Sequence, residues 1–224
     1  MEFIPQVIVT GGYMTPPEVQ TGQKVGQDKL LKIYSEIREA GFAYQAFQLE
    51  GDDSGATMQG QPLGELVTVR PPLVQVQSIL TEGSTIDAAG RKTQRLTEIV
   101  ARVLGVAEIL QLGIRIIFHA ALPSNDGRDF MLGKVLSAGN QHLDELRMGA
   151  EIWGGVKYYV AHPRGTYTFN VEPAIADEMK SLYIEMDAQF PGTHSPSEVL
   201  DRVEEVSDYV KTRLGSYLDK LATV

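Results

Sequence analysis

The stretch that decides the fold is EILQLGIRIIFHA, residues 108–120. Its even positions are apolar: Leu110, Leu112, Ile114, Ile116 and Phe118. Its odd positions carry Gln111, Arg115 and His119. Because successive side chains of a strand point to opposite faces, this alternation predicts a strand with one buried face and one more polar face.

Three further strands are predicted downstream. Residues 152–161 are aromatic and rich in β-branched side chains, and apolar and polar residues alternate cleanly over 166–172 and again over 182–189. Pro191-Gly192 is expected to end the last of these strands, because proline cannot donate a ladder hydrogen bond. A run of strands at this spacing is typical of an antiparallel sheet.

The chain then enters a long helix whose start is well marked. Ser195 suits the N-cap, Pro196 the first helical position, and Glu198 completes a capping box. A narrow apolar seam follows at steps of three and four residues: Val199, Val203, Val206, Val210, Leu214, Tyr217 and Leu221. The seam has two uses that do not exclude each other, packing on the chain's own sheet or on a second chain. The interface candidates are Val199, Val203, Val206, Val210, Leu214 and Leu221.

The first half shows a similar order of elements. The predicted strands are 2–10, 42–50, 66–70 and 73–80, with helices at 27–40 and 85–104, an extended connector at 15–22 and a flexible loop at 51–64. Ser84 and Asp87 resemble a capping box for the second of these helices. The sequence therefore predicts an α+β protein, with an antiparallel-dominated sheet, helices mainly on one face and a long C-terminal amphipathic helix.

The repeated order suggests two lobes, residues 1–105 and 106–224, which together could form one compact unit. Two interpretations of the order stay open. One is an ancient duplication of a strand, helix, strands and helix unit. The other is an α+β fold in which this order arises without duplication.

Composition excludes several classes of function. The chain has 224 residues, enough to bury a substantial core, and it has no cysteine, which rules out disulfides, cysteine nucleophiles and thiolate metal sites. Its formal net charge of −9 argues against nucleic acid as the main partner. The most apolar stretch, 109–122, is too short and too polar to span a bilayer, and the N-terminus lacks the features of a secretory signal. A cytoplasmic location is expected.

One group of residues could carry chemistry. Arg115 and His119 share a face of one predicted strand, and Glu185 and Asp187 share the polar face of another. If the two strands are neighbours, these side chains would converge and could bind an anion, hold a metal or perform acid–base chemistry. The competing interpretation is a half-exposed sheet with ordinary cross-strand charge pairs. A single histidine with two carboxylates is a weak metal signal, so no metal is predicted.

The second half also resembles a known group of proteins. The matching segments are Leu112-Gly113-Ile114-Arg115, Val171-Glu172-Pro173, the strand from Leu182 to Asp187, and the long closing helix. In these the chain is similar to the C-terminal region of a sporadically distributed family of uncharacterised bacterial proteins. It departs from the family at 116–119, where it reads IIFH instead of a tyrosine-isoleucine-asparagine run. The resemblance implies no catalytic residues.

No phosphate loop, dinucleotide fingerprint or nucleophile elbow occurs in the sequence. We therefore expect a non-enzymatic cytoplasmic binding or assembly protein, a homo-oligomer or one with a protein partner, which needs no cofactor and contacts neither nucleic acid nor membrane. The alternative is an enzyme or a small-ligand or anion-binding protein that uses the face around Arg115, His119, Glu185 and Asp187.

Overall fold

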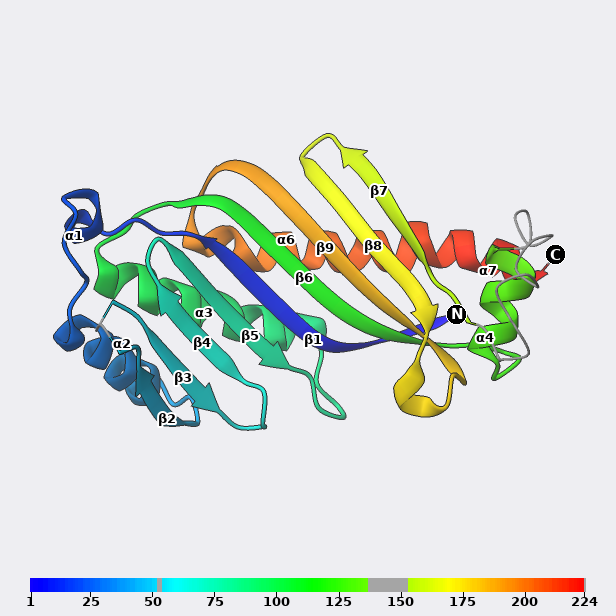
Figure 1. Cartoon of the computed structure of the whole chain (residues 1–224), viewed down its shortest axis with the longest axis horizontal. Helices are drawn as coiled ribbons and strands as arrows, with labels where there is room; N and C mark the ends of the chain where they lie inside the picture. The colour runs from blue at the N-terminus through cyan, green and yellow to red at the C-terminus, as the bar shows by residue number, and fades with distance from the viewer. Residues whose placement is uncertain (52–53, 137–152, 224) are drawn as a thin grey trace.

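A nine-stranded antiparallel sheet runs through the whole molecule in the order β2-β3-β4-β5-β1-β6-β9-β8-β7 (Figure 1). The computed structural model describes residues 1–51, 54–136 and 153–223. The strands are β1 (Glu2–Tyr13), β2 (Tyr44–Leu49), β3 (Ala56–Gly60), β4 (Leu66–Arg70), β5 (Leu73–Ile79), β6 (Ile109–Ala121), β7 (Val156–His162), β8 (Gly165–Pro173) and β9 (Ser181–His194).

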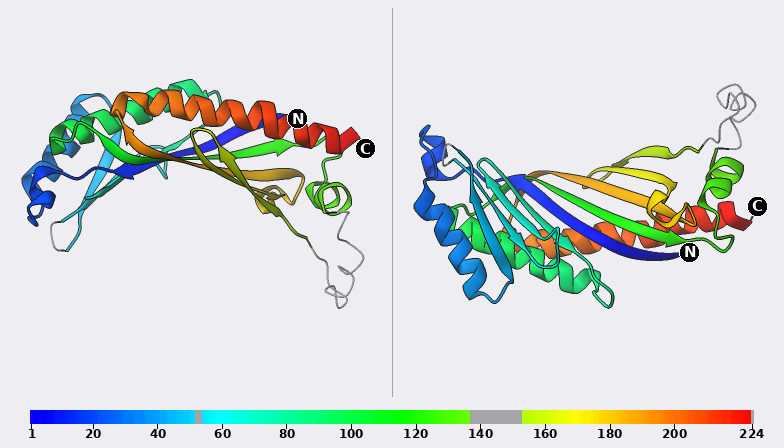
Figure 2. Two further views of the ribbon diagram at one scale, coloured as in Figure 1. Left: turned by 90° about the horizontal axis from the view of Figure 1, so that it is seen from above. Right: turned by 60° about the horizontal axis from the view of Figure 1, so that its bottom comes forward.

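The long helices cover one face of this sheet (Figure 2). The α-helices are α1 (Pro17–Gln20), α2 (Gln27–Glu39), α3 (Ile86–Leu104), α4 (Gly127–Phe130), α6 (Val199–Tyr209) and α7 (Gly215–Thr223). A π-helical turn at Val210–Leu214 joins α6 to α7, another at Met131–Val135 follows α4, and short 3₁₀ turns lie at Ile175–Asp177 and Pro196–Glu198. The predicted fold class is confirmed: an α+β fold with an antiparallel sheet and a long C-terminal helix.

The terminal helix uses its apolar seam inside the chain. Val199, Val203, Val206, Val210 and Leu214 are all buried, Leu221 is partly buried, and Tyr217 is exposed. Gly90 of α3 allows the close approach of α6, since a Cβ there would lie 2.8 Å from a methyl carbon of Leu200. The predicted capping box of Ser195 and Glu198 is present. A contact with a second chain through the seam would therefore require α6 and α7 to leave the sheet.

The two halves of the chain meet at the pairing of β1 with β6. Strands β1 to β5 fill one side of the sheet and β6 to β9 the other, so the hydrogen-bonded ladder passes from residues 1–105 to residues 106–224 without a break. Each half consists of one long strand, a helix, a meander of antiparallel strands and a long helix. Ile8 and Ile116 lie opposite each other at this junction and are fully buried.

One position breaks the alternation that predicts β6. Gln111 has a positive φ of 54°, and the pairing with β9 shifts register between Leu110 and Leu112. Such a bulge adds a residue and reverses the alternation beyond it. Ile109 is therefore buried, and Leu110, which the alternation places in the core, is 49% exposed.

Four other details differ from the sequence-based expectation. β3 lies inside the predicted loop at 51–64, and α1 lies inside the predicted extended connector. The N-cap of α3 is Thr85 rather than Ser84, since the Thr85 side chain accepts from the backbone N–H of Ala88. β9 continues past Pro191 to His194, because Pro191 falls in the register shift opposite Gln111, where the ladder needs no donor.

Candidate functional site

The face of the sheet opposite α3, α6 and α7, hereafter the open face, brings three of the four predicted site residues together. Arg115 on β6 lies directly opposite Asp187 on β9, and Glu185 is the next residue of β9 on the same face. The Arg115 guanidinium donates to Asp187 through Nη2 at 3.0 Å, and its Nε lies 3.3 Å from Glu185 Oε1. The two strands are therefore neighbours, which is the condition for these side chains to converge.

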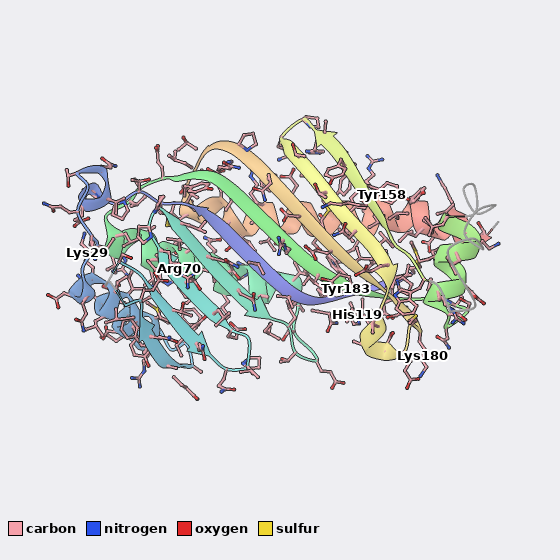
Figure 3. All side chains as sticks on the ribbon, viewed as in Figure 1. Lys29, Arg70, His119, Tyr158, Lys180 and Tyr183 are labelled. Atoms are coloured by element: carbon pink, nitrogen blue, oxygen red, sulfur yellow. The ribbon has the colours of Figure 1, made fainter. Side chains whose placement is uncertain are left out.

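His119 lies further along β6, away from the ion pairs. It is opposite Tyr183 (Figure 3), and the two rings meet edge to face with centroids 6.3 Å apart. Tyr183 donates its hydroxyl to Glu185 Oε2 at 3.0 Å. Burial, and then this hydrogen bond, raise the pKa of Tyr183 to about 12. His119 is thus separated from Glu185 by a phenol that stays protonated at neutral pH.

The charges of this cluster are largely satisfied among its own members. One guanidinium and two carboxylates give a formal charge of −1, and both carboxylates engage Arg115. Arg115 is 48% exposed and each carboxylate about half that. Partly exposed pairs directly across two strands are the ordinary chemistry of a half-solvated sheet. A bound anion would have to compete with two carboxylates for the same guanidinium.

A hollow of about 280 Å³ lies beside this cluster on the open face. Its floor is the backbone of Gly11 on β1 and Gly113 on β6, which face each other directly across the two strands. The remaining lining residues are Val9, Gly12, Tyr13, Leu73, Gln75, Gln111, Ile114, Arg115, Asp187 and Gln189. Because the two paired residues both lack a side chain, the surface of the sheet has a depression at this position.

At the level of these two glycines, the residues paired across the sheet are of the same types on both sides. Outward from Gly11 come Gln75 and Thr68, and outward from Gly113 come Gln189 and Thr166. The Gln189 amide lies over Gly113 and donates from Nε2 to Asp187 Oδ1 at 2.7 Å. Sequence reasoning missed these residues. Glycines within strand patterns were the available signal, but their pairing depends on the register.

A second charged cluster holds α6 against the outer strands β7 and β8. Glu205, whose side chain is mostly buried, accepts a hydrogen bond from Tyr167 at 2.8 Å and contacts Arg202 at 2.9 Å and Arg164 at 3.1 Å. His162 stacks on the Tyr167 ring with centroids 4.5 Å apart. These contacts join β7, β8 and α6, so the cluster serves to hold the helix in place.

The two outer edges of the sheet differ in how they are protected. β2 has a bulge between Tyr44 and Ala46, and Tyr34 of α2 donates a hydrogen bond to the backbone carbonyl of Tyr44. Bulges and covering helices are the usual protection of an edge strand. β7 instead pairs with β8 over seven residues without a register shift. Within residues 1–51, 54–136 and 153–223, no backbone hydrogen bond joins its outer side to another segment.

Comparison with known proteins adds little to this description. No helix in the described part of the chain is long and apolar enough to cross a membrane. No family model and no curated protein matches the sequence. Among solved structures, the rolling circle replication initiator protein from Geobacillus stearothermophilus is similar over 91% of this chain and 80% of its own, at 12% identity and a TM-score of 0.34. The S. pombe Pct1 RNA triphosphatase, solved in complex with the Spt5 CTD, is similar over 97% of this chain and 82% of its own, at 8% identity and a TM-score of 0.16. At these TM-scores, neither likeness carries an argument about function.

Proposed function

We propose that this chain is a non-enzymatic, cytoplasmic binding and assembly protein that self-associates by pairing the outer edge of β7 with β7 of a second copy. The observation that supports this is that, in the described part of the chain, no segment pairs with the outer edge of β7. The strand has no proline, glycine or bulge, and its sequence VKYYVAH is rich in β-branched and aromatic residues. Such an edge is a template for a further strand.

The direction of the backbone groups suits a two-fold antiparallel pair. The hairpin between β7 and β8 has a two-residue turn that closes on His162 and Gly165. In the alternation of an antiparallel ladder, Lys157, Tyr159 and Ala161 then turn their N–H and C=O groups outward. A pair centred on Tyr159 would align these groups on both chains and let both copies exchange hydrogen bonds.

The side chains agree with this register. Tyr159 is 71% exposed on the open face and would lie opposite its own copy, an aromatic cross-strand pair. Lys157, which carries the one charge of the strand apart from His162 at its end, would lie opposite the partner's Ala161, so that like charges do not meet. A closed two-fold dimer is the commonest form of homo-oligomer.

Sedimentation equilibrium of the purified chain tests this proposal. The expected result is a dimer, twice the 24.6 kDa of the monomer. Tyr159→Pro removes an outward N–H and leaves the ladder with β8 intact, so it is expected to give a folded monomer. Tyr159→Phe keeps the backbone and the ring and is the matched control. A monomer for the unmodified chain, or a dimer that persists in Tyr159→Pro, would contradict assembly through β7.

A second candidate function is ligand binding on the open face. It is favoured by the convergence of Arg115, Glu185 and Asp187 beside the hollow. A thermal-shift screen with metals, nucleosides, nucleotides and common metabolites would test it, because a ligand that binds only the folded state raises the melting temperature. Stabilisation that is lost in Arg115→Ala supports this function. A screen without any stabilisation counts against it.

A further inference from the structure

The two glycines under the hollow are not required by the backbone. Neither Gly11 nor Gly113 has a positive φ. A Cβ on Gly11 would meet only the carbonyl oxygen of Val74, at an ordinary 3.6 Å. A Cβ on Gly113 would lie 3.1 Å from the flexible amide end of Gln189. Glycine weakens a strand interior and often marks a bulge or a site where a ligand or another backbone approaches closely. The pairing of β1 with β6 shifts register after Gly11, and the space above Gly11 leaves room for such an approach.

The walls of the hollow offer donors and acceptors in fixed positions. No hydrogen bond within the described residues occupies the side chains of Tyr13, Gln75 or Gln111, and the Oε1 of Gln189 is also unused. Each amide presents a donor and an acceptor in one plane. Tyr13 and Leu73, both substantially exposed, close the end of the hollow opposite Asp187.

The charges around the hollow favour a neutral ligand. Arg115 is the one cationic side chain in the lining, and two carboxylates already hold it. A phosphate or carboxylate would thus find no uncommitted cation, on a chain with a formal net charge of −9. A neutral ligand could instead hydrogen-bond to Arg115, which donates, and to Asp187, which accepts. The amides of Gln75 and Gln189 offer it the same combination of a donor beside an acceptor.

We propose that this hollow binds a neutral planar heterocycle with adjacent donor and acceptor atoms, the chemistry of a nucleobase. The ring would lie on the backbone of Gly11, beside the Gln189 amide that covers Gly113, with its edges hydrogen-bonded to Gln75 and Gln189. A volume of about 280 Å³ is just below the usual range of drug-sized ligand sites, so the hollow suits a ligand no larger than a base or a nucleoside. This inference rests on the ligand-binding candidate above and does not depend on assembly through β7.

Calorimetric titration with adenosine and with uridine tests the proposal, with AMP and UMP as charged counterparts. Binding of at least one nucleoside is expected, and binding of its monophosphate is expected to be weaker. Titration with a single-stranded oligonucleotide of the same base shows whether the ligand is a free nucleoside or a base within a nucleic-acid strand. A free nucleoside is expected to bind more tightly than the strand, whose phosphates are repelled by the acidic chain. The reverse order would overturn the free-nucleoside form of the proposal.

The decisive variant is Gly11→Val, which fills the hollow with a side chain that favours strands. We expect it to fold normally and to weaken binding by at least about tenfold. Thr57→Val, on the open face of β3 and away from the hollow, is the control and is expected to bind as the unmodified chain does. Wild-type affinity in Gly11→Val, or no binding of any probe at millimolar concentration, would overturn the site. Sedimentation of Gly11→Val reports on β7 assembly separately, so failure of one proposal is distinguishable from failure of the other.

Discussion

Arg115 and Asp187, 72 positions apart in the sequence, lie directly opposite each other on β6 and β9, with the guanidinium Nη2 3.0 Å from the carboxylate Oδ2. The pair lies on the open face, beside the glycine floor of the hollow. Because it is partly exposed, solvent screens its attraction. Its main consequence is to fix the position of the polar groups that a ligand would meet.

Asp187→Asn is expected to lower the free energy of unfolding only slightly, by about 0.5 kcal/mol, because exposed ion pairs contribute little to stability. Urea denaturation measures this change. Gln189→Ala, which removes the other donor to Asp187, is a useful comparison. A loss above roughly 2 kcal/mol in Asp187→Asn would mean that the pair contributes to stability like a buried one.

Val206→Asp combined with Val210→Asp is expected to unfold the protein rather than dissociate a folded dimer. Both valines are completely buried against the chain's own core, and an unpaired carboxylate in such a place costs several kcal/mol (order of magnitude). Far-ultraviolet circular dichroism distinguishes the two outcomes. Lys211→Asp, at an exposed position of the same helical segment, is the control. A folded monomer from the double variant would show that the seam serves association instead.

Lys92→Ala is expected to be among the most destabilising single changes at a charged residue. Glu65 is 1% exposed, accepts a hydrogen bond from the backbone of Ile79, and has Lys92 Nζ 2.6 Å from its other oxygen. Removing the lysine leaves a buried carboxylate without its counter-charge, at a cost of about 3–5 kcal/mol. Denaturant unfolding of Lys92→Ala and of Lys92→Ala with Glu65→Gln measures it. The second change should recover part of the loss, and equal stability of the two variants would refute this explanation.

The start of the terminal helix makes stability depend on acid pH. The backbone N–H of Ser195 donates to Glu198 and is the main cause that lowers the pKa of this carboxyl. A carboxyl with a lowered folded-state pKa stabilises the fold above its unfolded-state value, near 4.5 here, and this contribution is lost as the pH falls further. Thermal melts from neutral to strongly acid pH should therefore fall less steeply for Glu198→Gln than for the unmodified chain. Identical acid profiles for Glu198→Gln and the unmodified chain would contradict the effect.

Much of the fold follows from side-chain periodicity. The alternation over 166–172 and 182–189 predicts β8 and β9, and the capping signals at Ser195 predict the start of the terminal helix. Side-chain periodicity gives the wrong face where a backbone irregularity changes the direction of the side chains. The bulge at Gln111 places Leu110 in solvent, and nothing in the neighbouring sequence marks it.

The candidate site could be predicted only in part. Strand faces place Arg115 with His119, and Glu185 with Asp187, but the sequence leaves open whether β6 and β9 are neighbours. Register then separates His119 from the ion pairs by placing it opposite Tyr183. The glycine floor is a property of two strands about a hundred residues apart, so no local pattern could reveal it.

Amide hydrogen exchange at β7 tests the central claim of self-association most directly. Lys157, Tyr159 and Ala161 are the residues expected to turn their N–H groups to the outer edge, and in a β7–β7 dimer these three amides are hydrogen-bonded. The account predicts that they exchange slowly and that their protection increases with protein concentration. Fast exchange of all three at every concentration, while the inward amides of Tyr158 and Val160 stay protected, would contradict it.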